Sequence, residues 1–262
     1  MRLTRFAMLC LGLGLAAACS DDDISAPTLP PLAGVRFINA VADTNEVDIR
    51  MIDQVEYTPT ASKLNFRQGT QHQPTEAKAR HIRVFPNSTN IDVTQNFMLD
   101  TTITIEANTR VTLLLTGSAR AKTLKFVTIT DDVSAPAAGT IAARLVNASS
   151  APVNGYLVDT TTSAISGTAT VANVAPLTAS AYVSRPVGKA AFRVTDVGSV
   201  TANASTSGPI LAAIPGENAP ASVTSEGTKF SAYYFPRGVA GSKQTATTAA
   251  VVWFVDRNPA DK

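Results

Sequence analysis

The sequence predicts an all-β protein with two tandem immunoglobulin-like β-sandwich domains behind a signal peptide and a flexible tether. Three observations lead to this prediction. Short alternating or β-branched segments recur between Gly, Pro, Asn and Asp residues, and one set of these segments occurs twice in the same order. Beyond the N-terminal apolar run, no long segment has helical periodicity. A small barrel is the main alternative for each domain.

Length and composition indicate a folded chain with two cores. The chain has 262 residues, of which 45% are hydrophobic and 16% are charged. Removal of Arg2 and Arg5 with a signal peptide lowers the 22 basic residues to 20, equal to the 20 acidic ones. A neutral mature chain without a basic cluster has no electrostatic footprint for nucleic acid, so we exclude that partner.

Residues 1–18 have the pattern of a signal peptide. Two arginines precede an apolar run from Phe6 to Ala18, and 13 helical residues span only about 20 Å, too short for a bilayer of about 30 Å. The small residues at 16–18 then provide a cleavage site before Cys19.

Cys19 is the predicted lipid attachment site. Leu-Ala-Ala-Ala-Cys at 15–19 resembles a bacterial lipobox, except that Ala16 stands where leucine is preferred. The resemblance implies acylation of Cys19 and membrane association through acyl chains, palmitate among them. Cys10 leaves with the signal, so the mature chain has no disulfide partner for Cys19. The alternative is ordinary secretion with a free thiol.

Residues 19–33 are predicted to form a polar tether. Three aspartates at 21–23 and prolines at 27, 30 and 31 leave little to bury, and the stretch from 20 to 33 reaches about 40 Å if extended. The aspartates indicate either a solvated linker or an acidic signal resembling those that export some lipoproteins to the cell surface. We expect an outer-membrane protein that faces the periplasm or the surface.

An internal repeat defines the two domains. Residues 35–40 read Val-Arg-Phe-Ile-Asn-Ala, and 108 residues later 143–148 read Ala-Arg-Leu-Val-Asn-Ala. Further pairs follow in the same order: 47–53 with 153–159, 82–84 with 192–194, and 124–129 with 249–254. We therefore predict independently folding domains at 34–133 and 140–258, joined by a linker at 134–139.

The individual strands are predicted from their periodicity. Val47, Ile49 and Met51 alternate with polar residues, as do the residues of 102–106, so these strands are half-buried. The runs 110–116 and 247–255 are apolar on both sides, which is typical of strands covered by a second sheet. Residues 74–80 could form at most two turns of helix.

These residues also carry a resemblance to a known family. The start at 35–40, the Val-Asp-Ile strand at 47–49, the Thr-Leu-Leu-Leu-Thr-Gly strand at 112–117 and Thr-Asp-Asp at 130–132 resemble the bacterial domain-of-unknown-function family numbered 4397. The resemblance is strongest over 34–133 and implies a secreted or lipid-anchored envelope protein made of β-sandwich repeats. It supplies no catalytic residues.

The sequence contains few residues for catalysis or metal binding. His72 and His81 are the two histidines, and neither has a nucleophile motif nearby, so we expect structural roles. Asp131 and Asp132 should point to opposite faces of a strand and not act as an acid–base pair. A calcium site using Asp131, Asp132 and Glu106 is the alternative. We predict no catalytic, cofactor or metal residues.

Aromatic residues and loops suggest where a ligand could bind. Residues 233–235 and 253–254 hold five aromatics, which we expect mostly in the core, with an exposed ring for stacking on glycan as the alternative. The loop at 215–220 in the second domain is the first candidate for a binding loop, and 68–75 in the first domain is the second.

The predicted function is that of a non-catalytic cell-envelope lipoprotein that acts as a binding or structural module for an envelope glycan or protein. The alternative is an envelope hydrolase, or an accessory subunit of an enzyme, acting on glycan or protein.

Overall fold

The computed structural model describes residues 29–54, 60–159, 164–199, 201–207, 225–238 and 248–259. The chain divides into a unit Met1–Pro30 and a compact unit Pro31–Lys262. The predicted signal peptide, Cys19, most of the tether and the loop at 215–220 lie outside the described residues. Within the described part, no helix has the length and apolar character required to cross a bilayer.

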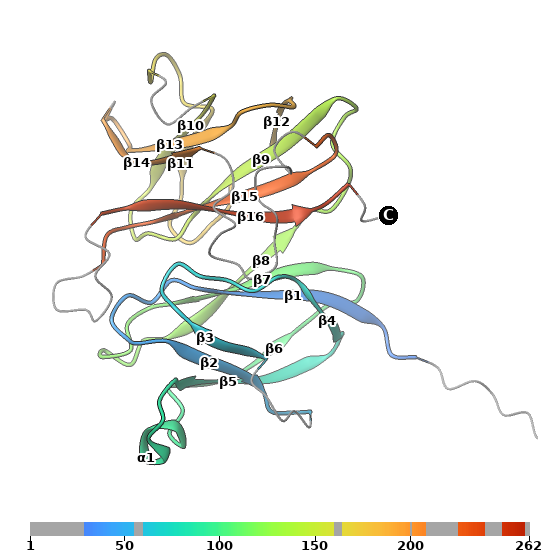
Figure 1. The fold of residues 1–262 in the computed structure, drawn as a ribbon, viewed down its shortest axis with the longest axis vertical. Coiled ribbons are helices and arrows are strands. Elements are labelled where there is room, and N and C mark those ends of the chain that lie inside the picture. The colour runs from blue at the N-terminus through green and yellow to red at the C-terminus, as the bar shows by residue number, and fades with distance from the viewer. Residues whose placement is uncertain are drawn as a thin grey trace, which may run out of the picture. The chain divides into compact units, whose positions relative to one another are not determined.

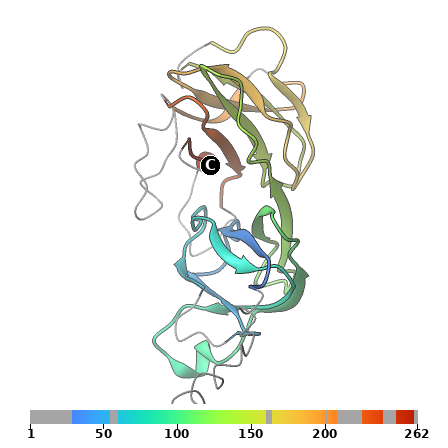
Figure 2. The same ribbon diagram turned by 90° about the vertical axis from the view of Figure 1, so that its right-hand side faces the viewer.

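The first module, Leu32–Asp131, is a sandwich of two four-stranded sheets (Figures 1 and 2). Its strands are β1 (Leu32–Asn39), β2 (Val47–Met51), β3 (Ala61–Leu64), β4 (Gln73–Glu76), β5 (Ala79–Pro86), β6 (Leu99–Thr104), β7 (Arg110–Thr116) and β8 (Lys125–Asp131). The sheet orders are β4-β1-β7-β8 and β3-β2-β5-β6. Strand β1 pairs in parallel with β7, and the other pairings are antiparallel.

The second module, Thr140–Arg257, repeats this topology strand by strand. Its strands are β9 (Thr140–Asn147), β10 (Val153–Val158), β11 (Val171–Val174), β12 (Val183–Pro186), β13 (Ala191–Asp196), β14 (Ala202–Ser207), β15 (Lys229–Phe235) and β16 (Ala250–Arg257). The orders β12-β9-β15-β16 and β11-β10-β13-β14 match those of the first module, including the parallel pair β9–β15. The predicted all-β class and the sandwich are confirmed.

The predicted alternation of more buried and less buried residues is confirmed in both strands for which the sequence indicated it. Val47, Ile49 and Met51 of β2 are buried, whereas Asp48 and Arg50 are half-buried. Strand β6 alternates between half-buried and exposed residues. This pattern follows from the two-residue period of a strand, which turns successive side chains to opposite faces of the sheet.

Three details add to the sequence prediction. Strand β1 begins at Leu32, inside the predicted tether. Residues 74–80 form parts of β4 and β5 and no helical turn, because their backbone groups pair with β1 and β6. The one helix in the described residues is α1 (Ile91–Thr94), capped by the Asn90 side chain, which accepts a hydrogen bond from the Asp92 amide.

The repeated asparagine explains part of the sequence repeat. Asn39 ends β1 and donates from Nδ2 to the Leu64 carbonyl at 2.9 Å, and Asn147 ends β9 and donates to the Val174 carbonyl at 2.9 Å. Each side-chain oxygen accepts from the amide two residues later, again at 2.9 Å in both modules. The duplicated motif therefore reflects a duplicated strand-to-loop connection.

Each module has its own core, and a second apolar layer joins the two modules. Val35 and Phe37 of β1 pack into the first module's core, whereas Ile38 belongs to the cluster that contains the second module's core. Hydrogen bonds from Arg36 of β1 to Val255 and Asp256 of β16 lie in this layer. Independent folding of the modules stays a prediction, but they do contact each other extensively.

Candidate functional site

A buried charge cluster occupies the contact between the modules. Arg36 on β1 is 1% exposed and donates from Nη2 to Oδ1 of Asp256 on β16 at 2.7 Å. Its Nε bonds Thr112 Oγ1 on β7 at 3.0 Å, and its Nη1 bonds the Val255 carbonyl at 3.1 Å. Asp131, at the end of β8, lies 3.4 Å from Nη2.

Arg144 on β9 makes the corresponding contacts in the opposite direction. Its Nη2 donates to Oδ1 of Asp131, its Nε to Ser231 Oγ at 2.7 Å, and its Nη1 to the Thr130 carbonyl at 2.9 Å. Each arginine therefore bonds a hydroxyl of its own module and a carbonyl and a carboxylate of the other module.

His72 and Tyr182 complete the cluster at equivalent places. His72 lies just before β4, and its Nε2 is 2.8 Å from Oδ2 of Asp131, so a neutral ring donates its proton there. Tyr182 lies just before β12 and donates from its hydroxyl to Oδ2 of Asp256 at 2.7 Å. The predicted structural role of His72 agrees with this position.

Neighbouring charges hold the cluster in one protonation state at neutral pH. Burial raises the pKa of Asp131, but the charge of Arg36 and the hydrogen bond from His72 outweigh it and leave the pKa below its usual value. Burial and the charge of Arg36 lower the pKa of His72, and the hydrogen bond to Asp131 opposes this shift. With His72 neutral, the formal charges of two arginines and two aspartates cancel.

Asp132 points away from the cluster, as the sequence predicted. It accepts a hydrogen bond at 2.6 Å from Lys229 Nζ, which lowers the pKa of Asp132 to about 2. Glu106 is exposed beyond β6, so the structure does not bring the three carboxylates of the alternative calcium site together. Among the described residues, no group of three His, Cys, Asp or Glu side chains is placed to hold a metal.

The second histidine has a surface position. His81 is in β5, where its Nε2 bonds Oδ1 of Asp100 on β6, and Arg83 donates to the other oxygen of Asp100 at 2.7 Å. These contacts join neighbouring strands on the outer face of the sheet, consistent with the structural role expected for His81.

The alternative of an exposed ring for glycan stacking is wrong for the aromatic strands. Tyr233, Phe235 and Phe254 point out of the second sandwich, but the first module covers them. Tyr234 and Trp253 face the second module's own core. The sequence correctly indicated that successive aromatic side chains of a strand point to opposite faces. The outward-facing rings are nevertheless buried, because the first module covers them.

The second candidate binding loop, residues 68–75, is also part of the module contact. A Cβ atom added to Gly69 would lie 2.7 Å from the Phe254 ring, and His72 belongs to the charge cluster. This loop is therefore packed against the second module, which argues against a free binding loop.

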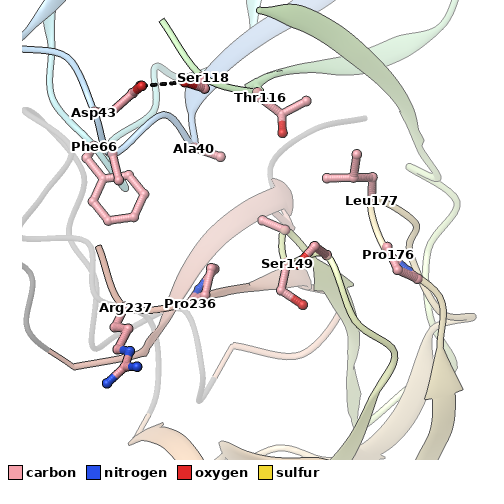
Figure 3. A pocket seen from close by; sticks show the side chains of 14 residues that line it. Ala40, Asp43, Phe66, Thr116, Ser118, Ser149, Pro176, Leu177, Pro236 and Arg237 are labelled. Carbon is pink, nitrogen blue, oxygen red and sulfur yellow. Dashed lines mark hydrogen bonds between the residues drawn. The ribbon is translucent and has the colours of Figure 1, made fainter. Parts of the chain in front are cut away.

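A cleft of about 520 Å³ opens at the junction of the modules, beyond the ends of β1, β7, β9 and β15 (Figure 3). Ala40 and Ala148, which follow the two repeated asparagines, both line it. Ala42 and Gly117 on one side correspond to Ser150 and Pro236 on the other. Both modules thus contribute equivalent segments to the walls.

One wall of the cleft carries a carboxylate that accepts three hydrogen bonds. Asp43 accepts hydrogen bonds from Ser118 Oγ at 2.6 Å and from the amides of Ala119 at 2.9 Å and Arg120 at 3.1 Å. Burial raises the pKa of Asp43, but these hydrogen bonds lower it by a larger amount. The pKa of Asp43 therefore lies below its usual value. Asp43 is therefore ionised at neutral pH and does not supply a proton.

The opposite wall has an apolar part and a cationic rim, beside the hydroxyl groups of Ser149 and Ser150. Pro176 and Leu177 face the cleft from the second module, and Arg237 is exposed at its edge (Figure 3). Phe66, an aromatic ring in the lining, is buried against Phe235 with ring centroids 5.9 Å apart. The cleft thus has apolar surface, hydroxyl groups and separated charges of both signs.

No sequence motif indicated this cleft. Its lining comes from six separate segments of the chain, none of which has a binding motif. The available signal was the repeated Asn-Ala pair at 39–40 and 147–148, which marks the strand ends where the cleft opens.

Comparison with protein families identifies most of the first module and the start of the second. The model described as Domain of unknown function (DUF4397) matches residues 33–156. This part of the chain, just under half of it, is similar to the DUF4397 family. The DUF4397 match begins in β1, crosses the linker and ends in β10. It includes Arg36, Asp131 and Arg144, three of the four charged residues of the cluster.

Other comparisons add little to this match. No curated protein matches the sequence. A solved structure, described as alpha-glucan recognition by family 41 carbohydrate-binding modules from streptococcal virulence factors, is 11% identical with a TM-score of 0.21. The alignment covers 66% of this chain and 85% of that one. A similarity at this level says nothing about the ligand of this protein.

Proposed function

We propose that this protein is a non-catalytic envelope protein, held at the membrane by an acylated Cys19, that binds a ligand in the cleft between its two modules. The observation that carries the proposal is the cleft of about 520 Å³, a size typical of ligand sites, with walls from both modules.

The chemistry of the charged residues supports a non-catalytic role. A general acid or base needs a proton that it can exchange with a substrate. The cluster residues bond one another in the module contact, and Asp43 in the cleft stays ionised among three hydrogen-bond donors. The arrangement suits holding two modules and a ligand in place.

The lining favours a segment of an envelope protein as the ligand. Sugar rings bind proteins largely by stacking on exposed aromatic faces, whereas Phe66 is buried and the wall offers Pro176 and Leu177. Apolar side chains of a polypeptide fit such a wall, and Arg237 at the rim can pair with an acidic residue of that polypeptide.

The test is a pull-down from intact envelopes with the soluble chain that begins at Ser20. Ser150→Trp places a large ring in the cleft from an exposed position, and Thr102→Trp places the same ring on the exposed face of β6 as the matched control. We expect the unmodified chain and Thr102→Trp to retain the same envelope protein and Ser150→Trp to lose it.

Ala42→Trp blocks the cleft from the other wall and should have the same effect as Ser150→Trp. Equal thermal unfolding of the variants would show that the loss of ligand is not a loss of fold. Retention of the ligand by both cleft variants would contradict the proposal.

A further inference from the structure

The contact between the modules uses the same face of both. In the first module this face consists of six buried residues on three strands, namely Arg36, Ile38, Thr112, Leu114, Ile129 and Asp131. In the second module the equivalent strand positions hold Arg144, Val146, Ser231, Tyr233, Phe254 and Asp256, all buried. We call these the first and the second contact face.

The residue alternation shows that each face is separate from its module's core. Leu113 and Leu115 of β7 pack inside the first sandwich, whereas Leu114 between them belongs to the cluster shared with the second module. Strands β1 and β7 are therefore buried on both sides, once by their own second sheet and once by the other module.

The polar contacts across the two faces are reciprocal. Arg36 reaches Asp256 and the Val255 carbonyl, and Arg144 reaches Asp131 and the Thr130 carbonyl. A contact in which residue i of one partner meets j of the other, while j meets i, is the isologous geometry of a two-fold dimer. Here the two partners are modules of one chain.

We propose that the contact face is a self-recognition surface of the module, whose partner is another module of the same family with an arginine on its first strand and an aspartate on its last. The reciprocal network supplies specificity, because a partner lacking either residue would leave a buried charge unpaired. Recognition should therefore persist when the covalent link between the modules is cut.

Differences between the two contact faces favour pairing of a first module with a second module over pairing of two identical modules. The first face has Leu114 and Ile129 where the second has the larger Tyr233 and Phe254. Two first faces together would leave space, and two second faces would crowd their rings, whereas a small face against a large one fills the contact. The first module should thus prefer the second module to a copy of itself.

The experiment cuts the linker of the complete soluble chain. A protease site replaces residues 135–138, which lie between β8 and β9. After cleavage, the two halves are separated in denaturant and refolded together or apart. We expect the mixed halves to re-form a one-to-one complex with the size of the uncut chain. The first half alone should not self-associate at the same concentration.

Asp256→Asn tests the reciprocal network, with Asp159→Asn as the matched control. Asp256 is buried and bonds Arg36, whereas Asp159 is exposed in its pair with Arg185. Asp256→Asn should weaken the association of the halves about 30-fold or more, and Asp159→Asn less than threefold. Trp253, packed against Phe192 and Phe230 in the second module's core, reports by its fluorescence that the variant half is folded.

Three results would overturn the proposal. The cut halves could separate at micromolar concentration although both are folded. A folded Asp256→Asn half could bind as tightly as the Asp159→Asn half. The first half could also bind itself as tightly as it binds the second, which would contradict the proposed preference for unlike modules. The outcome does not depend on the cleft ligand.

Discussion

Asp131 and Asp132 are neighbours in the chain with opposite surroundings. Asp131 bonds His72, Thr112 and Arg144 with no exposed side-chain surface, whereas the side chain of Asp132 is 55% exposed beside Lys229. Strand geometry turns one carboxylate into the module contact and the other into solvent. The same chemical change should therefore have very different effects at these two positions.

Asp131→Asn should lower the free energy of unfolding by about 3–5 kcal/mol, because Arg36 and Arg144 lose a buried counter-charge. Asp132→Asn should cost less than about 1 kcal/mol, because solvent screens its pair with Lys229. Urea unfolding of the soluble chain measures both values. Equal losses in the two variants would contradict the structural assignment of Asp131.

His72 should make the protein less stable in mild acid. Its pKa is lowered in the folded protein, so the unfolded chain binds a proton more readily, and stability falls as the pH drops below about 6.5. The pKa of Asp131 is also lowered, but its contribution is lost only near and below the ordinary aspartate pKa of about 4. Unfolding measured between pH 7.5 and 5 therefore separates the contribution of His72 from that of Asp131.

His72→Tyr gives the first module the residue that the second module has at Tyr182. A tyrosine hydroxyl donates a hydrogen bond but does not titrate between pH 7.5 and 5. We expect this variant to lose most of the pH dependence between 7.5 and 5. His81→Gln, on the exposed face of β5, is the matched control and should keep it. An unchanged pH profile in His72→Tyr would assign the dependence to another group.

At the scale of elements, the segment between β3 and β4 decides how closely the modules approach. Gly69 bridges Ile38 of β1, and an added Cβ would lie 2.8 Å from Ile38 and 2.7 Å from the Phe254 ring. In the second module, Ala179 bridges Val146 at the equivalent place. Glycine is needed in the first module because a ring of the second lies against it.

Gly69→Ala should destabilise the chain by about 1–3 kcal/mol, since its methyl group overpacks the module contact. The reciprocal change Ala179→Gly should cost only about 0.5–1 kcal/mol, the ordinary penalty for glycine in a strand. Adding Phe254→Leu to Gly69→Ala should recover part of the loss, as seen in thermal unfolding. If the stability loss of the double variant equals the sum of the losses of Gly69→Ala and Phe254→Leu, the clash with Phe254 is not the cause.

At the scale of the whole molecule, the proposed anchor separates membrane attachment from the folded modules. Cys19→Ser should move the protein from the membrane fraction to the soluble secreted fraction. Each buried CH₂ contributes about 0.8 kcal/mol, so two or three acyl chains supply nearly all the membrane affinity. Cys10→Ser, within the predicted signal peptide, is the control and should leave fractionation unchanged. Membrane retention of Cys19→Ser would overturn the lipid anchor.

Local patterns were enough to predict the strands and the duplication. The alternation in 47–51 and 102–106 depends only on the two-residue period of a strand, and the repeat of Arg and Asn at 36, 39, 144 and 147 is visible in the sequence itself. These features do not require knowledge of which surfaces meet.

The module contact and the cleft were decided by the tertiary structure. The apolar runs at 110–116 and 247–255 indicate strands covered on both sides, but they do not say that the second cover is the other module. Arg36 and Asp256 lie 220 residues apart along the chain, and the six cleft segments converge only when the modules pack. Periodicity determines which side of a strand a residue occupies, whereas its partner depends on how separate sheets come together.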